Sequence, residues 1–166
     1  VLVTPPDVDH TLFSFTTCHR GRYSNYPPYG LGVLGANLRE IGAEVTLVNL
    51  NSRILRDAQE TLTENDFDFE DSWKSELDLE LSRIRPDLIG VTCMFSQTHA
   101  SLINVCQHIA NSYPSIPIAV GGVHITNSIV TPDTAQNIYS ELECVDFFFK
   151  YECDVAFGNF VEIVNG

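Results

Sequence analysis

The chain has 166 residues, the length of one domain, and its apolar fraction of 44% is enough for a hydrophobic core, which argues against a disordered protein. Its formal net charge of −13 argues against nucleic acids and anionic membranes as partners, because both favour surfaces rich in lysine and arginine. The acidic excess is concentrated within residues 57–80, which we expect to form a solvated face.

The five cysteines are widely spaced and none forms a CxxC pair, so neither a zinc ribbon nor a thioredoxin-like site is expected. Their odd number, without a signal peptide, favours the reducing cytoplasm. No apolar run approaches the ~20 residues that cross a bilayer, so we expect no membrane partner. The first residue already belongs to a strand-like run, and we therefore expect residues 1–166 to be a single domain of a longer protein.

Five short apolar runs, rich in β-branched residues, are predicted to be strands: residues 1–4, 44–49, 88–93, 116–120 and 145–149. Apolar residues at helical spacing predict helices over residues 27–42, 73–84, 102–110, 132–142 and 152–164. This alternation predicts an α/β fold of the flavodoxin-like, Rossmann-like doubly wound kind. We expect a five-stranded parallel sheet in the order 2-1-3-4-5 with helices on both faces.

Two segments do not follow the regular alternation. Residues 7–26 show no helical period, and they are interpreted either as a mobile or partner-covered surface loop or as a loop that folds over a ligand. Residues 52–71 are polar and acidic and are predicted to be part helix and part loop. In the regular helices, Trp73 is expected to be a core anchor and His108 to be solvated.

A GxGxxG pattern occupies residues 30–35, which makes a nicotinamide dinucleotide site a hypothesis to weigh. That fingerprint requires the glycines directly after a strand, whereas here a long segment intervenes. The next strand also ends in Asn49, with no carboxylate to bind a ribose. The pattern is therefore interpreted as close packing of a helix on the sheet.

The carboxyl ends of strands 1, 3, 4 and 5 are expected to border one crevice, and their residues do not form a catalytic set. Ser96 and His99 are close in sequence, but no nucleophile elbow surrounds them. There is no Walker A sequence and no metal-ligand cluster, so neither catalytic nor metal-binding residues are predicted. Glycines, hydroxyls and soft apolar groups at these ends suit a large, flat, mostly uncharged ligand with amide edges.

These segments resemble the cobalamin-binding domain that precedes the radical S-adenosylmethionine core of cobalamin-dependent radical enzymes, many of which are methyltransferases. The resemblance rests on residues 27–45, on 85–91, on a Gly-Gly-x-His-x-Thr loop within 120–126, and on 149–157. Two departures stand out. The family's Gly-Glu-Gly-Glu is replaced by Tyr-Glu-Cys-Asp at residues 151–154, and the Asp-x-His-x-x-Gly signature is absent.

The resemblance implies a cobalamin site formed by Thr92, Met94, Phe95, Ser96, Gly121, Gly122, Val123, His124, Tyr151 and Glu152. The two glycines would let the nucleotide tail or the corrin edge lie against the backbone. The hydroxyls would bond the tail or amide groups, Met94 and Phe95 would face the lower side of the corrin, and Glu152 would bond the tail or cap the last helix. His124 has three possible roles: an amide contact, a loop histidine with its own partner, or a cobalt ligand. His10 and His19 are further candidates for that ligand.

The function that the resemblance implies is a cobalamin-binding module of a radical S-adenosylmethionine enzyme, with methyl transfer as the expected activity. The CxxxCxxC signature of a 4Fe-4S cluster is absent from these residues, so the cluster and S-adenosylmethionine would belong to a downstream domain, the expected protein partner. One alternative is a degenerate module that binds no cobalamin and serves in docking or substrate recognition. Another is an unrelated flavodoxin-like domain that binds a flavin or nucleotide.

Overall fold

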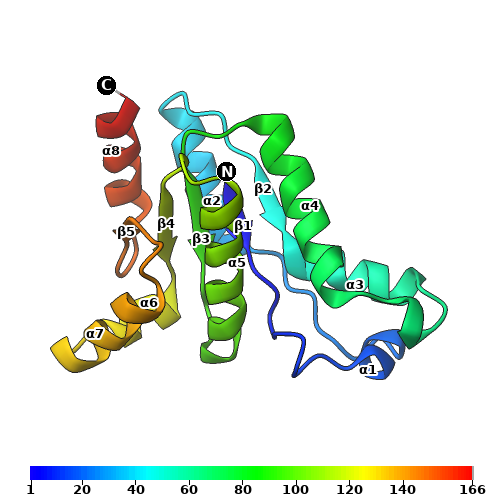
Figure 1. The fold of residues 1–166 in the computed structure, drawn as a ribbon. Helices are drawn as coiled ribbons and strands as arrows, with labels where there is room; N and C mark the ends of the chain where they lie inside the picture. The colour runs from blue at the N-terminus through cyan, green and yellow to red at the C-terminus, as the bar shows by residue number, and fades with distance from the viewer. Residues whose placement is uncertain (166) are drawn as a thin grey trace.

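The structure is a computed structural model that describes residues 1–165. Its core is a five-stranded, all-parallel sheet in the order β2-β1-β3-β4-β5 (Figure 1). The strands are short: β1 (Leu2–Thr4), β2 (Leu47–Asn49), β3 (Ile89–Thr92), β4 (Ile118–Gly121) and β5 (Phe147–Phe148). The predicted doubly wound topology is confirmed, although β2 and β5 are shorter than their apolar runs.

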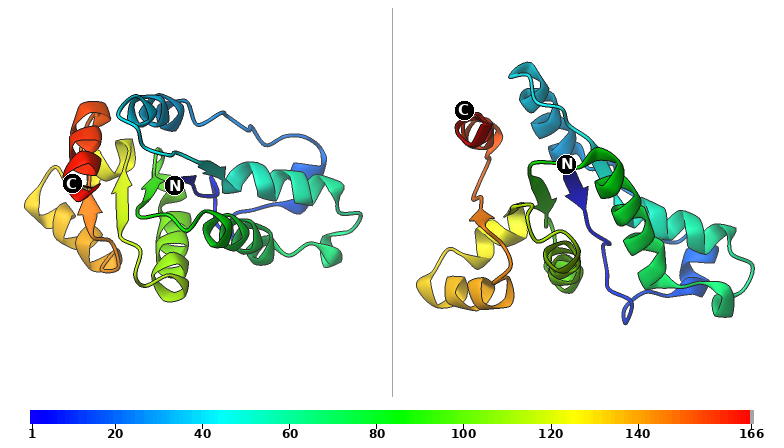
Figure 2. Two further views of the ribbon diagram at one scale, coloured as in Figure 1. Left: turned by 90° about the horizontal axis from the view of Figure 1, so that it is seen from above. Right: turned by 45° about the horizontal axis from the view of Figure 1, so that its top comes forward.

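Helices cover both faces of the sheet, as predicted (Figure 2). One face carries α2 (Tyr29–Glu40) and α8 (Asp154–Asn165). The other face carries α3 (Leu50–Glu60), α4 (Phe69–Ile84), α5 (His99–Ser112), α6 (Val123–Ser128) and α7 (Pro132–Glu141). None of the helices within residues 1–165 has the length and apolar character needed to cross a membrane.

The two faces of the sheet differ in the size of their side chains. Because successive strand residues point to opposite faces, Ile89, Val91, Ile118 and Val120 pack with α4 and α5 in a large core that includes the buried Trp73. The alternate positions, which face α2 and α8, hold the small residues Gly90, Ala119 and Gly121. Small side chains on this face leave room between the sheet and its two helices.

Both interpretations of residues 7–26 stay predictions, but the segment is not without regular structure. It contains the short helix α1 (Phe15–His19), which begins at Ser14, whose hydroxyl accepts a hydrogen bond from the Thr17 amide. Phe15 and Cys18 of this helix are buried against α3. A helix of five residues is too short to show a periodic pattern, which is why the sequence predicted none.

His108 is not the solvated side chain that the sequence predicted. Its Nε2 lies 2.8 Å from the Asp78 carboxylate of α4, and its ring packs edge-on against Trp73. The acidic segment 57–80 is likewise partly engaged, because Arg53 forms ion pairs of 2.8 Å with Asp57 and 3.1 Å with Glu76. Some of the carboxylates in this segment are therefore paired with a basic side chain and do not form a purely solvated face.

The ends of β3 and β4 are locked together by backbone contacts around Gly122. The Cys93 amide donates to the Gly121 carbonyl at 2.8 Å, and the His124 amide donates to the Cys93 carbonyl at 3.1 Å. Gly122 has φ +109° and ψ 174°, a conformation that is essentially restricted to glycine. A Cβ at this position would also overlap the Cys93 carbonyl oxygen. Gly122 is thus required by the fold itself, whether or not a ligand approaches it.

We expect Gly122→Ala to lower the free energy of unfolding by about 3 kcal/mol, because it combines a forbidden backbone conformation with a backbone clash. Gly121→Ala is the matched control. Its Cβ would lie 3.5 Å from the Cβ of Phe149, an ordinary contact, so its effect should stay below about 1 kcal/mol. Urea denaturation followed by circular dichroism measures both; equal losses would contradict the role assigned to Gly122.

Candidate functional site

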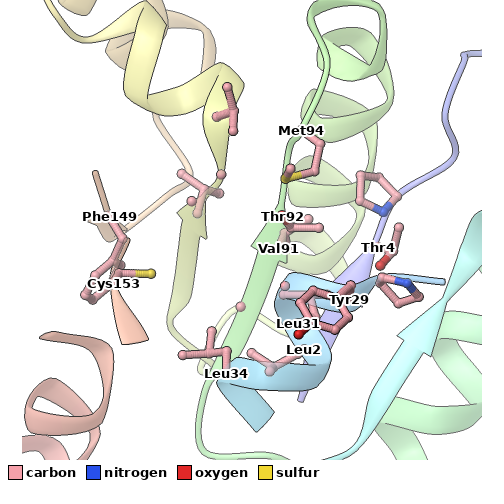
Figure 3. Close-up of a pocket in the computed structure, with 18 of the residues that line it drawn as sticks. Leu2, Thr4, Tyr29, Leu31, Leu34, Val91, Thr92, Met94, Phe149 and Cys153 are labelled. Atoms are coloured by element: carbon pink, nitrogen blue, oxygen red, sulfur yellow. The ribbon is translucent and has the colours of Figure 1, made fainter. Parts of the chain in front are cut away.

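A cavity of about 1150 Å³ lies between α2, α8 and the carboxyl-terminal half of the sheet (Figure 3). Phe149 and Cys153 lie on one side of it, and Leu2, Leu31 and Tyr29 lie on the other. Its floor is the face of the sheet that carries small residues. The cavity therefore results from the asymmetry between the two faces.

The inner part of the cavity is apolar. Its walls are formed by Leu2, Leu31, Leu34, Phe149 and Phe157, which belong to the hydrophobic cluster between the sheet and helices α2 and α8. A Cβ on Gly90 would lie only 2.8 Å from the Cδ2 atom of Leu2, so this part of the floor has no room for a larger residue. Flat, weakly polar groups are what such a slot accommodates best.

The outer part of the cavity carries hydrogen-bonding groups, chiefly Thr4, Asp7, Asn49, Asn51, Thr92, Thr98, Thr126 and Glu152. Asp7 and Asn51 are joined by two hydrogen bonds. The side-chain amide of Asn51 donates to the Asp7 carboxylate at 3.0 Å, and the backbone amide of Asp7 donates to the side-chain oxygen of Asn51 at 3.1 Å. Burial raises the pKa of the Asp7 carboxyl group. The hydroxyl of Thr4 is buried and has no hydrogen-bond partner among the residues that the structure describes.

The mouth of the cavity is surrounded by exposed apolar and aromatic side chains. Tyr26 and Tyr29 stand on the side of α2, Met94 and Phe95 follow directly after β3, and Tyr151 precedes α8. All five are among the large side chains that remain exposed to solvent. A broad apolar rim of this kind offers contact area to a flat ligand larger than the slot itself.

The structure brings most of the predicted site residues together around this cavity: Thr92, Met94, Phe95, Gly121, Gly122, Val123, Tyr151 and Glu152 line it. Ser96 and His124 do not. Ser96 begins a 3-10 turn (Ser96–Thr98) at which the chain leaves the rim, and Thr98 of the same turn lines the cavity instead. Neither His10 nor His19 lines it. Which of the lining residues contact a cofactor stays a prediction.

His124 is held outside the cavity by a chain of hydrogen bonds. Its Nε2 lies 3.0 Å from Nδ1 of His99, and Nε2 of His99 lies 2.8 Å from the Glu141 carboxylate (side chains from α6, α5 and α7). Burial, and to a lesser degree the neighbouring His99, lowers the pKa of His124. Of the three roles considered from the sequence, the geometry fits that of a histidine with its own protein partner.

Several lining residues were not predicted, and most come from the start of the chain and from α2: Leu2, Thr4, Asp7, Tyr29, Leu31, Leu34, Asn49 and Asn51. One available signal was the pair Asn49 and Asn51, because amides directly after a strand are placed to meet a ligand. In the structure Asn49 also caps α3, accepting from the Ser52 amide at 2.9 Å. The α2 residues gave no signal, because their spacing is that of any helix packed on a sheet.

Tyr151 occupies a strained position at the mouth. Its φ of +60° lies in the left-handed region, which favours glycine. Its backbone amide donates to the Thr126 hydroxyl at 2.9 Å, which ties the segment before α8 to α6. A tyrosine thus occupies a backbone conformation that favours glycine.

A large cavity at the carboxyl edge of a doubly wound sheet is typical of a ligand-binding domain. Within residues 1–165 no three His, Cys, Asp or Glu side chains are placed to hold a metal ion together. The model of the B12 binding domain family matches residues 21–131, the greater part of the chain, which includes strands β2, β3 and β4. The chain therefore belongs to the B12-binding domain family. A comparison with curated proteins gives no match.

We expect Tyr151→Gly to raise the free energy of unfolding by roughly 0.5–1 kcal/mol, because relief of left-handed strain exceeds the added entropy of the unfolded chain. Tyr151→Ala is the control, since it removes the ring but keeps the Cβ that causes the strain. Urea denaturation midpoints compare the three proteins. If the alanine variant gained as much as the glycine variant, the ring and not the backbone would be the source.

The lowered pKa of His124 predicts a pH-dependent stability. The unfolded chain binds a proton more readily than the folded chain, so stability should fall as pH drops below the ordinary histidine value of ~6.5. The wild-type protein should therefore lose free energy of unfolding between about pH 7 and pH 5. His124→Gln, which keeps His99 and Glu141, should lose less, and we expect the difference to be below about 1 kcal/mol. Denaturation curves at the two pH values test this; identical losses would contradict it.

Proposed function

We propose that this domain binds cobalamin in the cavity, with the nucleotide tail between α2 and α8 and the corrin ring over the mouth. The observation that carries the proposal is the division of the cavity into an apolar inner slot and a polar outer part at the carboxyl edge of a doubly wound sheet. Membership of the B12-binding domain family supports the same ligand.

The residues present fit this cofactor. Cobalamin combines a broad corrin edged with amides and a tail that carries phosphate, ribose and a flat aromatic base. The outer Asn49, Asn51 and Glu152 offer partners for amides and hydroxyls, and the orphaned Thr4 hydroxyl offers a further donor. Met94 and Phe95 provide an apolar surface for the lower side of the corrin.

The cofactor would supply a cobalt centre able to carry a methyl group, and the protein's part is to hold and shield it. No imidazole occurs among the described lining residues, so the cobalt would not be ligated by a histidine of this chain. Burial raises the pKa of the Cys153 thiol, so this group stays neutral beside the bound tail. The chain thus contributes positioning and exclusion of water, without a catalytic group.

We extend the proposal to a module that precedes and serves a radical S-adenosylmethionine core, with methyl transfer as the overall reaction. The resemblance of residues 27–45, 85–91, 120–126 and 149–157 to such modules supports this assignment. The exposed rim at Tyr26, Tyr29 and Tyr151 would face the partner that carries the 4Fe-4S cluster and S-adenosylmethionine. The five free cysteines are consistent with the cytoplasm.

A second candidate is a module of the same fold that binds no cobalamin and serves in docking or substrate recognition. It is favoured by Tyr151, whose large side chain stands at the mouth in a strained conformation. An absorbance titration with hydroxocobalamin separates the two candidates. A spectral shift with saturable binding supports the first, and the absence of any shift supports the second.

We expect Gly121→Val to weaken cobalamin binding by at least about tenfold, because its methyl groups would occupy the cavity floor while β4 tolerates a β-branched residue. Circular dichroism verifies that the fold is intact. Ser96→Ala and His124→Gln are the controls, since both residues lie outside the cavity and should leave the dissociation constant unchanged. A loss of binding in both controls, with Gly121→Val unaffected, would place the site elsewhere.

A further inference from the structure

Natural corrinoids share the corrin ring and differ in the base at the end of the nucleotide tail, which is a benzimidazole, a purine or a phenol. We infer that the inner slot of this domain selects the base, accepting benzimidazolyl and phenolyl corrinoids and rejecting purinyl ones. The inference rests on the proposed function, since it concerns which corrinoid the same cavity takes. It follows from the lack of hydrogen-bonding partners at the depth where the base would lie.

The side chains around the inner slot cannot serve a purine. Leu2, Leu34 and Phe157 are buried apolar residues, and Ala119 of the floor adds only a methyl group. Phe149 lies on the opposite side of the cavity (Figure 3). Its ring packs edge-on against that of Phe157. Aromatic walls of this kind stack well on any flat ring but offer no hydrogen bond to its edge.

The backbone of the slot's floor is unavailable too, because the strands use its hydrogen-bonding groups within the sheet. The Gly90 amide donates to the Val1 carbonyl at 2.8 Å, and the Phe149 amide donates to the Val120 carbonyl at 2.8 Å. Gly90 is also in register with Ala119 in the β3–β4 ladder. Unlike a loop, a floor made from central strands has no spare donors or acceptors.

Few polar side chains of the lining lie beside this apolar wall. They are the hydroxyls of Thr4 and Thr92, toward the carboxyl ends of β1 and β3, the Cys153 thiol, which is a weak donor, and the Asp154 carboxylate at the start of α8. One or two hydroxyls can serve the single free nitrogen of a benzimidazole, and a phenol ring needs still less. An ionised carboxylate only accepts hydrogen bonds, so Asp154 could not serve the ring nitrogens of adenine. Several of these nitrogens would be left unpaired, and unpaired buried polar groups weaken binding strongly.

The test is a comparison of dissociation constants for four cobalt(II) corrinoids: cobalamin, a cresolyl cobamide, an adeninyl cobamide, and cobinamide, which lacks the base. We expect cobalamin and the cresolyl form to bind at least about tenfold more tightly than the adeninyl form. Adenine is a weaker base than benzimidazole and leaves cobalt more easily, so coordination in the free cofactor works against cobalamin binding more tightly than the adeninyl form. The cresolyl base has no nitrogen that could coordinate cobalt, and the Ala119 variant described below therefore serves as the independent test for that pair.

Each other outcome overturns a different statement. Equal or tighter binding of the adeninyl form would overturn the selectivity while leaving cobalamin binding intact. If cobinamide bound as tightly as cobalamin, the slot would not hold the base at all. If none of the four corrinoids bound, the proposed function itself would fail.

A variant makes the test independent of differences between the cofactors. Ala119→Ser adds one hydroxyl to the floor of the slot with almost no change in volume. It should shift the ratio of adeninyl to cresolyl affinity in favour of adenine by about threefold or more. Ala135→Ser, which adds the same group to a buried residue of α7 on the opposite face, should leave the ratio unchanged. An unchanged ratio in Ala119→Ser would overturn the inference.

Discussion

The contact between Gly122 and the Cys93 carbonyl is the constraint on which the carboxyl edge of this domain depends. It permits the Cys93 and His124 backbone amides to complete the ladder beyond the last paired residues of β3 and β4, Thr92 and Gly121. The two central strands therefore end level with each other. The rim residues that follow β3 and those that follow β4 therefore start from the same level of the sheet.

The second determinant is the unequal filling of the two sheet faces. A parallel sheet must be covered on both sides, but the cover need not be equally dense. Large side chains and five helices cover one face densely, whereas Gly90 and Ala119 leave an apolar slot between the other face and helices α2 and α8. Most of the stabilising burial comes from the closed face, so the open face can hold a ligand cavity at little cost to stability.

The sequence was sufficient for the topology because strand runs, helical spacing and short connections each limit the possible arrangements. It was sufficient for part of the site, since the ends of parallel strands meet at one edge. The sequence did not show the direction in which His124 points. Helix α6 begins directly after Gly122, and it places His124 beside His99 and away from the cavity. The sequence also missed α1, whose five residues are held by a Ser14 cap and burial against α3.

Tyr151 shows how the two determinants meet at one residue. It follows β5, precedes α8 and is tied through its amide to Thr126 of α6, so it links the cover of the open face to the locked strand ends. A glycine here would make this link without strain. Left-handed strain persists only where surrounding contacts over-determine the backbone. The strained backbone at Tyr151 therefore lowers the stability of the fold, and packing elsewhere offsets this loss. Because the same residue stands at the mouth of the cavity, a substitution here affects both the opening of the cavity and the stability of the fold.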